Sequence, residues 1–299
     1  MFSDRLAGRA RIVQAMRSYF YDQDFLEVET PIRIPAPAPE AHIDSFESDG
    51  WFLQSSPELA MKRLLARGHN RIFQICKCFR RDERGPRHLT ELTMLEWYTK
   101  GYTYLELMDQ CTALVRHIAV QTGCKDRLSY NGQTIDLASP WEVITVDTAF
   151  RRYTATTLER AMSKGNFDEI MAFEIEPELG RSVPTFIMDY PASMAALARL
   201  KPEDPEFAER FELYIGGMEL ANGFSELNDP VEQRRRFKAE AAIRARARKP
   251  ATPMPEPFLK DLTSMPAAAG IALGVDRLVM LFTHADTIDK VVAFTPETL

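Results

Sequence analysis

Apolar residues recur at helical spacing in several stretches of the chain. Between residues 4 and 24 they run from Leu6 to Phe20 behind Ser3 and Asp4, residue types that commonly cap helices. This pattern predicts an amphipathic helix. Comparable spacing predicts further helices at residues 59–65, 104–122, 233–249 and 275–282.

Shorter apolar runs bounded by glycine or proline predict strands. The clearest pair is 210–215 and 218–224, because Gly216-Gly217 between them is a strong hairpin signal. Residues 129–183 carry mixed helix and loop signals, and they are the least informative part of the chain. Further strands are expected at residues 25–31, 43–46, 51–54, 71–79, 92–98, 184–191 and 269–274.

Two charged residues near the strands 71–79 and 92–98 stand out. Glu96 shares one strand face with Met94 and Tyr98, and a carboxylate in such an apolar strand needs a partner. Arg80 lies at the mouth of the same expected hairpin, where a guanidinium group suits a phosphate or carboxylate. Solvated charges on a surface hairpin are the alternative, and the position of Glu96 argues against it.

A second group of charged residues lies in the last third of the chain. Glu219, Asn222 and Glu226 follow the Gly-Gly turn, and two carboxylates near a hairpin end suit a hard cation. Surface decoration is the alternative for an isolated acid pair. Arg277 falls near a helix N-terminus, which favours anions, and Gly274 lets a ligand approach the backbone closely.

Composition narrows the function classes. The chain has 299 residues and a net charge of −6, which argues against a generic nucleic-acid binder. No apolar stretch approaches the roughly 20 residues of a membrane helix, and the start does not resemble a signal peptide. With four cysteines and no zinc-type spacing, we expect a cytoplasmic protein. Neither a P-loop nor a strand-linked G-x-G-x-x-G sequence is present.

The helix expected at 233–249 carries eight basic residues and one acid. A solvated helix face is the default interpretation of such a run. The alternative is a basic surface that steers an acidic partner toward the protein, mainly by raising the association rate.

Several of these stretches together resemble a known family. The run FRRDERGPRHLTELTMLEWY from Phe79 to Tyr98 resembles motif 2 of class II aminoacyl-tRNA synthetases, in the lysyl-tRNA synthetase group. Residues 25–31 with their preceding helix resemble motif 1, and AGIALGVDR at 269–277 resembles motif 3. The ending TMLEWY is most similar to the free-standing elongation factor P–(R)-β-lysine ligases. The resemblance extends over nearly the whole chain.

The resemblance implies a fold and an activity. The fold is α/β, a mostly antiparallel sheet flanked by helices, in one catalytic domain over residues 1–299 without an anticodon-binding domain. The implied reaction uses ATP and Mg²⁺ to activate lysine or (R)-β-lysine as an adenylate and transfers it to a lysine of elongation factor P. Motif 1 implies a homodimer. Two alternatives stay open: a truncated lysyl-tRNA synthetase acting on tRNA, and a non-catalytic regulatory paralog.

The resemblance also implies residue roles. Arg80 would hold the α-phosphate and the substrate carboxylate, Arg277 the γ-phosphate, and Glu219 with Glu226 the Mg²⁺. Further ATP contacts would come from Arg81, Asp82, Leu220 and Gly274. The amino acid would be bound by Ser56, Pro57, Glu58, Glu96, Tyr98, Asn222, Glu226 and Ala272.

Three of these positions carry further interpretations. Ser56 and Pro57 also suit the start of the helix at 59–65, and this capping role is compatible with substrate binding. Ala272 stands where lysyl-tRNA synthetases usually have glycine, which implies a preference for β-lysine. Leu89 departs from the family, whose asparagine at this position contacts ATP.

Overall fold

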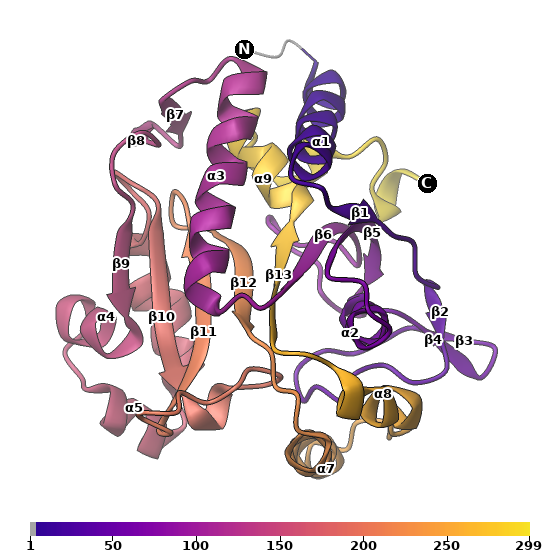
Figure 1. Cartoon of the computed structure of the whole chain (residues 1–299). Helices are drawn as coiled ribbons and strands as arrows, with labels where there is room; N and C mark the ends of the chain where they lie inside the picture. The colour runs from indigo at the N-terminus through magenta and orange to yellow at the C-terminus, as the bar shows by residue number, and fades with distance from the viewer. Residues whose placement is uncertain (1–3) are drawn as a thin grey trace.

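A computed structural model describes residues 4–299, and an eight-stranded sheet forms its centre (Figure 1). The strand order is β1-β5-β6-β13-β12-β11-β10-β9. Only the edge pairs β1/β5 and β9/β10 are parallel, and all other neighbours are antiparallel. The strands are β1 Leu26–Glu27, β5 Arg71–Phe79, β6 Glu91–Lys100, β9 Glu142–Thr145, β10 Thr185–Pro191, β11 Phe207–Tyr214, β12 Glu219–Ser225 and β13 Ala268–Gly274.

The two faces of the sheet have different roles because side chains alternate along each strand. On β6, Leu95 and Trp97 are fully buried in the main apolar core. This core also takes in the helices α1 Arg5–Asp22, α3 Tyr104–Thr122 and α9 Val275–Phe282. The opposite face carries Glu96 and Tyr98, and it is covered by α2 Glu58–Ala66, α7 Pro230–Arg246 and α8 Glu256–Asp261.

The antiparallel register aligns three predicted site positions and a fourth residue, Glu212, in one row across the sheet. Glu96 on β6 pairs with Ala272 on β13, which pairs with Asn222 on β12. Asn222 in turn pairs with Glu212 on β11. Because residues opposite one another point to the same face, this row builds the floor of a single site.

The region that the sequence leaves open packs against the β9–β10 edge. Residues 144–179 supply most of a second apolar cluster around α4 Val146–Tyr153, α5 Leu158–Lys164 and α6 Phe167–Ile170. A π-helix at Met171–Ile175 and a 3₁₀ turn at Glu176–Glu178 follow. Two small sheets lie outside the main one, formed by β2 Arg33–Ile34, β3 Glu47–Ser48 and β4 Trp51–Leu53, and by β7 Arg127–Tyr130 and β8 Gln133–Asp136.

The expected fold class is confirmed: the protein is α/β, with a mostly antiparallel sheet between helices. The helix at 104–122 and the Gly216-Gly217 hairpin appear as predicted, and both glycines have positive φ angles of 63° and 69°. The expected strands at 25–31 and 43–46 are wrong in extent. The first shrinks to β1, and the second reduces to a single bridge between Asp44 and Arg81.

Within residues 4–299, no helix is long and apolar enough to cross a membrane. The single-domain organisation and the homodimer stay predictions.

The basic helix is more than a solvated face. It spans Pro230–Arg246, three residues earlier than expected, and Arg244 on it is only 4% exposed. The Arg244 guanidinium donates to the carbonyl oxygens of Glu40 and Ile43, both at 2.9 Å, and pairs with Asp44 at 2.9 Å. Arg244 therefore fixes the backbone of the proline-rich loop at residues 34–44. Its guanidinium is not available on the surface to steer an acidic partner.

We predict that Arg244→Ala lowers the free energy of unfolding by about 3 kcal/mol, because it removes the donor of three carbonyl oxygens and leaves Asp44 with Lys249 as its ion-pair partner. Thermal unfolding measures this loss. Arg246→Ala, on the exposed side of the same helix end, is the matched control and should change stability little. Equal melting temperatures for the two variants would contradict the structural role of Arg244.

Candidate active site

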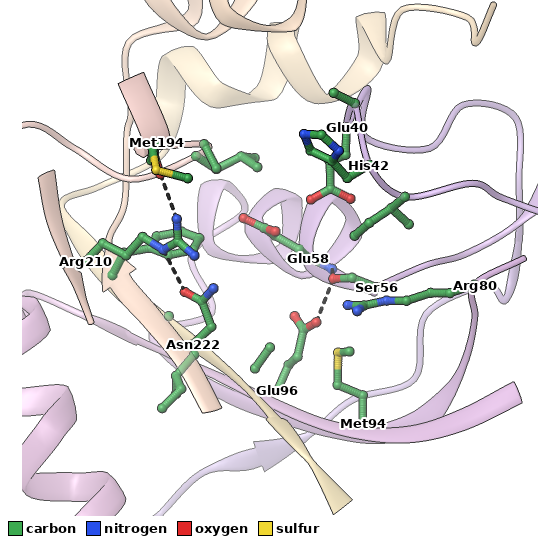
Figure 2. A pocket seen from close by; sticks show the side chains of 18 of the residues that line it. Glu40, His42, Ser56, Glu58, Arg80, Met94, Glu96, Met194, Arg210 and Asn222 are labelled. Atoms are coloured by element: carbon green, nitrogen blue, oxygen red, sulfur yellow. Dashed lines mark hydrogen bonds between the residues drawn. The ribbon is translucent and has the colours of Figure 1, made fainter. Parts of the chain in front are cut away.

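A cavity of about 870 Å³ lies on the face of the sheet that carries Glu96 and Tyr98, between the strand floor and α7 (Figure 2). Its floor comes from β6, β13 and β12, and one wall comes from α2. The predicted residues that line it are Ser56, Glu58, Arg80, Glu96, Tyr98, Glu219, Leu220, Asn222, Ala272, Gly274 and Arg277. The cavity thus collects residues from both halves of the chain.

Four predicted residues do not line this cavity. Pro57 serves as the N-cap of α2, and Glu226 is 2% exposed beneath the cavity wall. Arg81 and Asp82 are exposed and paired with each other, Nε to Oδ2 at 3.3 Å. Their predicted contacts with ATP have no support from this geometry.

Arg80 has an unpaired hydrogen-bond donor, as a binding site for an anion requires. It leaves the end of β5, and its guanidinium points into the cavity (Figure 2). Its Nε is buried without a hydrogen-bond partner among the described residues, and its only ion pair is with Glu83 at a loose 3.6 Å. A buried, unsatisfied guanidinium nitrogen is costly, so this group is well suited to a phosphate or carboxylate ligand.

Glu96 has the partners that its apolar strand predicts. One carboxylate oxygen accepts from Ser56 Oγ at 2.6 Å and the other from Tyr98 Oη at 2.7 Å. Ser56 Oγ also accepts from the backbone N–H of Glu58 at 3.0 Å, although Pro57 rather than Ser56 takes the N-cap position of α2. Burial, with the charge of Glu58, raises the pKa of Glu96 to about 7.

Lys62 is a site residue that sequence reasoning missed. Its side chain is 1% exposed, and its ammonium forms ion pairs with both Glu58 and Glu226. The signal was present, because Glu58 and Lys62 stand four residues apart on a predicted helix, but such pairs are usually exposed. Lys62 therefore joins α2 to the end of β12 directly beneath the cavity.

Glu219 and Glu226 do not lie together. They are seven residues apart along one strand, a span of roughly 23 Å, which is too long for one bound ion. Glu226 pairs with Lys62, whereas Glu219 pairs with Arg277 at 3.2 Å. Across the described chain, no group of three or more histidine, cysteine, aspartate or glutamate side chains could hold a metal by itself.

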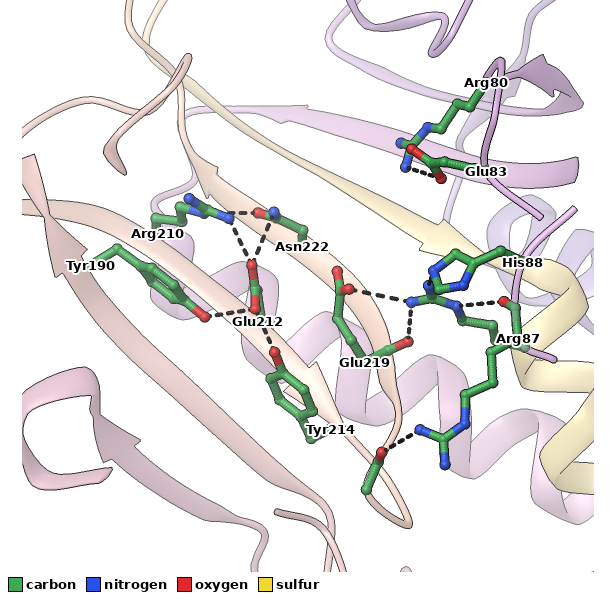
Figure 3. Close-up of polar contacts among 12 residues, drawn as sticks. Arg80, Glu83, Arg87, His88, Tyr190, Arg210, Glu212, Tyr214, Glu219 and Asn222 are labelled. Atoms are coloured by element: carbon green, nitrogen blue, oxygen red, sulfur yellow. Dashed lines mark hydrogen bonds and ion pairs between the residues drawn. The ribbon is translucent and has the colours of Figure 1, made fainter. Parts of the chain in front are cut away.

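Glu212 is an acid close to Glu219 that the sequence patterns did not indicate. It lies on the facing strand and accepts from Tyr190 and Tyr214 hydroxyls at 2.6 and 2.7 Å and from Arg210 at 2.6 Å (Figure 3). Burial and the charge of Glu219 raise the pKa of Glu212. The hairpin predicted at Gly216-Gly217 pairs the strands that carry Glu212 and Glu219, so the sequence did contain a signal that the two acids lie close together.

Arg277 occupies the other end of the cavity from Glu96. Its guanidinium donates to the Glu219 carbonyl at 2.8 Å and to the Arg87 carbonyl at 3.3 Å, and it contacts His88 (Figure 3). The nearby Leu89 is 3% exposed in the main core and presents no polar atom. Arg277 and Glu219 thus form a preassembled polar group at one end of the site.

Gly270 is a further position that the sequence analysis left out. A Cβ atom there would collide with the Tyr98 ring and with the Glu226 carboxylate. Glycine at this point of β13 therefore lets the cavity floor close over both side chains.

Comparison with known proteins relates this chain to a family of tRNA synthetases and to ligases. A family model described as tRNA synthetases class II (D, K and N) matches residues 1–298. The chain is 36% identical over 307 residues to the elongation factor P–(R)-β-lysine ligase of Vibrio cholerae, covering 97% of this chain and 94% of that protein.

Two further relatives extend the comparison. The ligase of the same name from Pectobacterium carotovorum is 39% identical over 310 residues, covering 98% of this chain and 95% of that protein. The lysine–tRNA ligase of Moorella thermoacetica is 37% identical over 314 residues, covering 96% of this chain and 64% of that protein.

The pKa of Glu96 generates a pH prediction. The native protein keeps a proton on Glu96 up to about pH 7, whereas the unfolded chain releases it near pH 4.5. The native state therefore binds more protons between these values, and the free energy of unfolding falls as pH rises through this window, by up to about 3 kcal/mol.

Thermal unfolding of the ligand-free protein from pH 5 to 8 checks this expectation. Glu96→Gln removes the titrating group while keeping the side-chain size, so its melting temperature should fall less steeply with pH than that of the wild type. Parallel pH profiles would show that Glu96 titrates normally.

Proposed function

Because the chain belongs to the class II tRNA synthetase family of the D, K and N group, we propose that it is an ATP-dependent ligase that activates a lysine-type amino acid and transfers it to elongation factor P. The observation that carries the proposal is the match over 97 to 98% of the chain to ligases of that name. The cavity supports it, since anion-binding and amine-binding groups converge there.

Two alternatives have less support. The lysine–tRNA ligase relative is equally similar, but the alignment covers 64% of that protein against 94 to 95% of the ligases. A non-catalytic paralog has no need to keep Arg80 with a buried free nitrogen or to hold Arg277 in a polar cluster. Both arginines line the cavity.

In the proposed first step, a carboxylate oxygen of the amino acid attacks the α-phosphorus of ATP. The bond from that phosphorus to the bridging oxygen breaks, and pyrophosphate leaves. Arg80 would hold the substrate carboxylate against the α-phosphate, where negative charge builds up, and Arg277 would bind the γ-phosphate. Positioning and charge neutralisation supply the rate enhancement without a covalent enzyme intermediate.

We assign the Mg²⁺ position to the Glu219 end of the cavity. Mg²⁺ is usually held by one or two carboxylates together with substrate phosphates, so the lack of a complete protein cage among residues 4–299 fits this role. Glu219 would contribute one ligand, with Glu212 as the neighbouring acid, and Glu226 is reassigned to the amino acid end. When bound, the ion would neutralise phosphate charge.

In the proposed second step, the side-chain amine of a lysine on elongation factor P attacks the acyl carbon of the adenylate. AMP leaves with the electron pair of the broken C–O bond, and the attacking nitrogen loses a proton. The distal ammonium of the amino acid would lie in the cluster of Glu58, Glu96 and Glu226, where Tyr98 also contributes its hydroxyl.

Assembly and location complete the proposal. We propose a homodimer formed through α1, β1 and the segment between β1 and β2, supported by apolar side chains left exposed there: Tyr21 at 53%, Leu26 at 50% and Ile32 at 40%. The four cysteines are free, which suits a cytoplasmic setting.

Mass spectrometry of elongation factor P tests the function. Incubation with this protein, ATP and each lysine isomer should add the mass of one acyl group to one lysine. Arg80→Ala should lower pyrophosphate exchange and modification at least about a hundredfold, because it removes a charge-assisted contact to the transition state. Unmodified elongation factor P with every isomer would overturn the proposal.

We predict that Ala272→Gly raises activation of α-lysine relative to (R)-β-lysine. Ala272 lies opposite Glu96 in the sheet and lines the cavity, so its methyl group limits space near the substrate. One methyl group shifts selectivity by roughly 1–3 kcal/mol. The ratio of kcat/KM values for the two isomers in pyrophosphate exchange measures this effect. An unchanged ratio would remove Ala272 from the selectivity determinants.

A further inference from the structure

Three carboxylates line the amino acid end of the cavity, a fourth is buried behind its lining, and one of the four has no partner. Glu58 and Glu226 are paired with Lys62, and Glu96 accepts from Ser56 and Tyr98. The Glu40 carboxylate lines the same cavity, but it makes no hydrogen bond or ion pair with any residue in the described range. Its full acceptor capacity is open to a ligand.

The backbone around Glu40 is held firmly although it belongs to a loop. The Ala41 N–H donates to the Glu240 carboxylate on α7 at 2.8 Å. The carbonyl of Glu40 accepts from Arg244 at 2.9 Å, and that of Ala41 accepts from Lys249 at 3.0 Å. Anchoring of this kind fixes where the Glu40 side chain enters the cavity, and Figure 2 shows its carboxylate pointing inward above Ser56 and Arg80.

Four charged residues from three parts of the chain act on Glu40. Arg80 at the end of β5 attracts it, whereas Glu58 on α2, Glu240 on α7 and Glu83 in the loop after β5 repel it. Burial is the largest influence, and together these effects raise the pKa of Glu40 to about 7. A ligand cation would relieve both the burial and the repulsion.

We propose that Glu40 is a positioning residue that binds the substrate ammonium nearest to the reacting carboxyl group. The inference rests on the proposed function, in which Arg80 holds that carboxyl group. The positive charge that acts on Glu40 is Arg80, and both line the cavity, whereas the Glu226 carboxylate is paired with Lys62. The two ends of a diamino acid therefore have separate acceptors: Glu40 near Arg80, and the Lys62-linked cluster at the far end.

This assignment adds a third point of attachment for the substrate. Arg80 holds the carboxylate, the Lys62-linked cluster holds the distal ammonium, and Glu40 fixes the torsion between them through the proximal ammonium. Holding that torsion keeps the attacking oxygen aimed at the α-phosphorus. A diamino acid should therefore gain more from Glu40 than an amino acid that has only the distal amine.

The test compares ligands with and without the proximal amine. Glu40→Gln keeps the size of the side chain and removes its charge. It should raise the KM for (R)-β-lysine or α-lysine in pyrophosphate exchange by about tenfold to a hundredfold, the usual effect of losing a charge-assisted hydrogen bond. The KM for ATP should stay within about twofold of the wild type.

6-Aminohexanoate, which has only the distal amine, is the discriminating ligand. Its inhibition constant against lysine-dependent exchange should change less than about twofold in Glu40→Gln. Glu40→Asp, which retains the charge, should recover part of the loss with lysine. Glu240→Ala, which loosens the loop by removing the acceptor of the Ala41 N–H, is the structural control and should leave the ratio between the two ligands unchanged.

Each outcome decides the inference. Equal weakening of lysine and 6-aminohexanoate in Glu40→Gln, or an unchanged KM for lysine, overturns it while leaving the proposed function intact. Failure of the wild type to activate any lysine isomer overturns the proposed function and this inference with it. Glu40→Gln should also melt no lower than the wild type, because it removes an unpaired, half-buried charge. A lower melting temperature would indicate a structural role instead.

Discussion

The ion pairs of Lys62 with Glu58 and Glu226 are the constraint on which the site depends. Lys62 is 1% exposed, and burial of several carboxylates without an internal cation would cost several kcal/mol for each. The ammonium lets Glu58 and Glu226 stay close together beneath the cavity. Because Lys62 is on α2 and Glu226 follows β12, the same contact holds the helix against the sheet. Stability and site geometry thus share one interaction.

The negative charge that Lys62 does not neutralise indicates which kind of ligand the site binds. Glu58, Glu96 and Glu226 are three carboxylates against one ammonium, which leaves two negative charges when all are ionised. An amino acid with a distal ammonium reduces this excess, whereas a neutral side chain leaves it uncompensated. Arg80, beside Ser56 and Glu96, provides positive charge for the substrate carboxylate and the α-phosphate, and Arg277 provides it at the other end of the cavity. The cavity is therefore polarised along its length, and that polarity orients both substrates.

Local patterns predicted much of the fold and part of the site. Helical spacing and the Gly216-Gly217 turn depend on neighbouring residues, so they can be read directly from the sequence. The row that aligns Glu96, Ala272 and Asn222 depends on the register of three strands far apart in sequence. Residue roles along that row came from family resemblance rather than from pattern. Glu219 and Glu226 were paired because they are close in sequence, although a strand separates them by roughly 23 Å.

The loop around Glu40 shows why the remaining part of the site could not be predicted from the sequence. Its proline-rich sequence lacks the alternation of apolar and polar residues that predicts a helix or a strand. Its conformation is fixed by Arg244 and Lys249, about 200 residues away. The basic run looked like a solvated surface because its charges are visible in the sequence and their buried acceptors are not. The two parts of the amino acid site therefore differ in construction: the sheet row and Lys62 form a rigid core, whereas Glu40 is held on a clamped loop. Changes in that loop can alter how the proximal amine is recognised without disturbing the buried ion pairs.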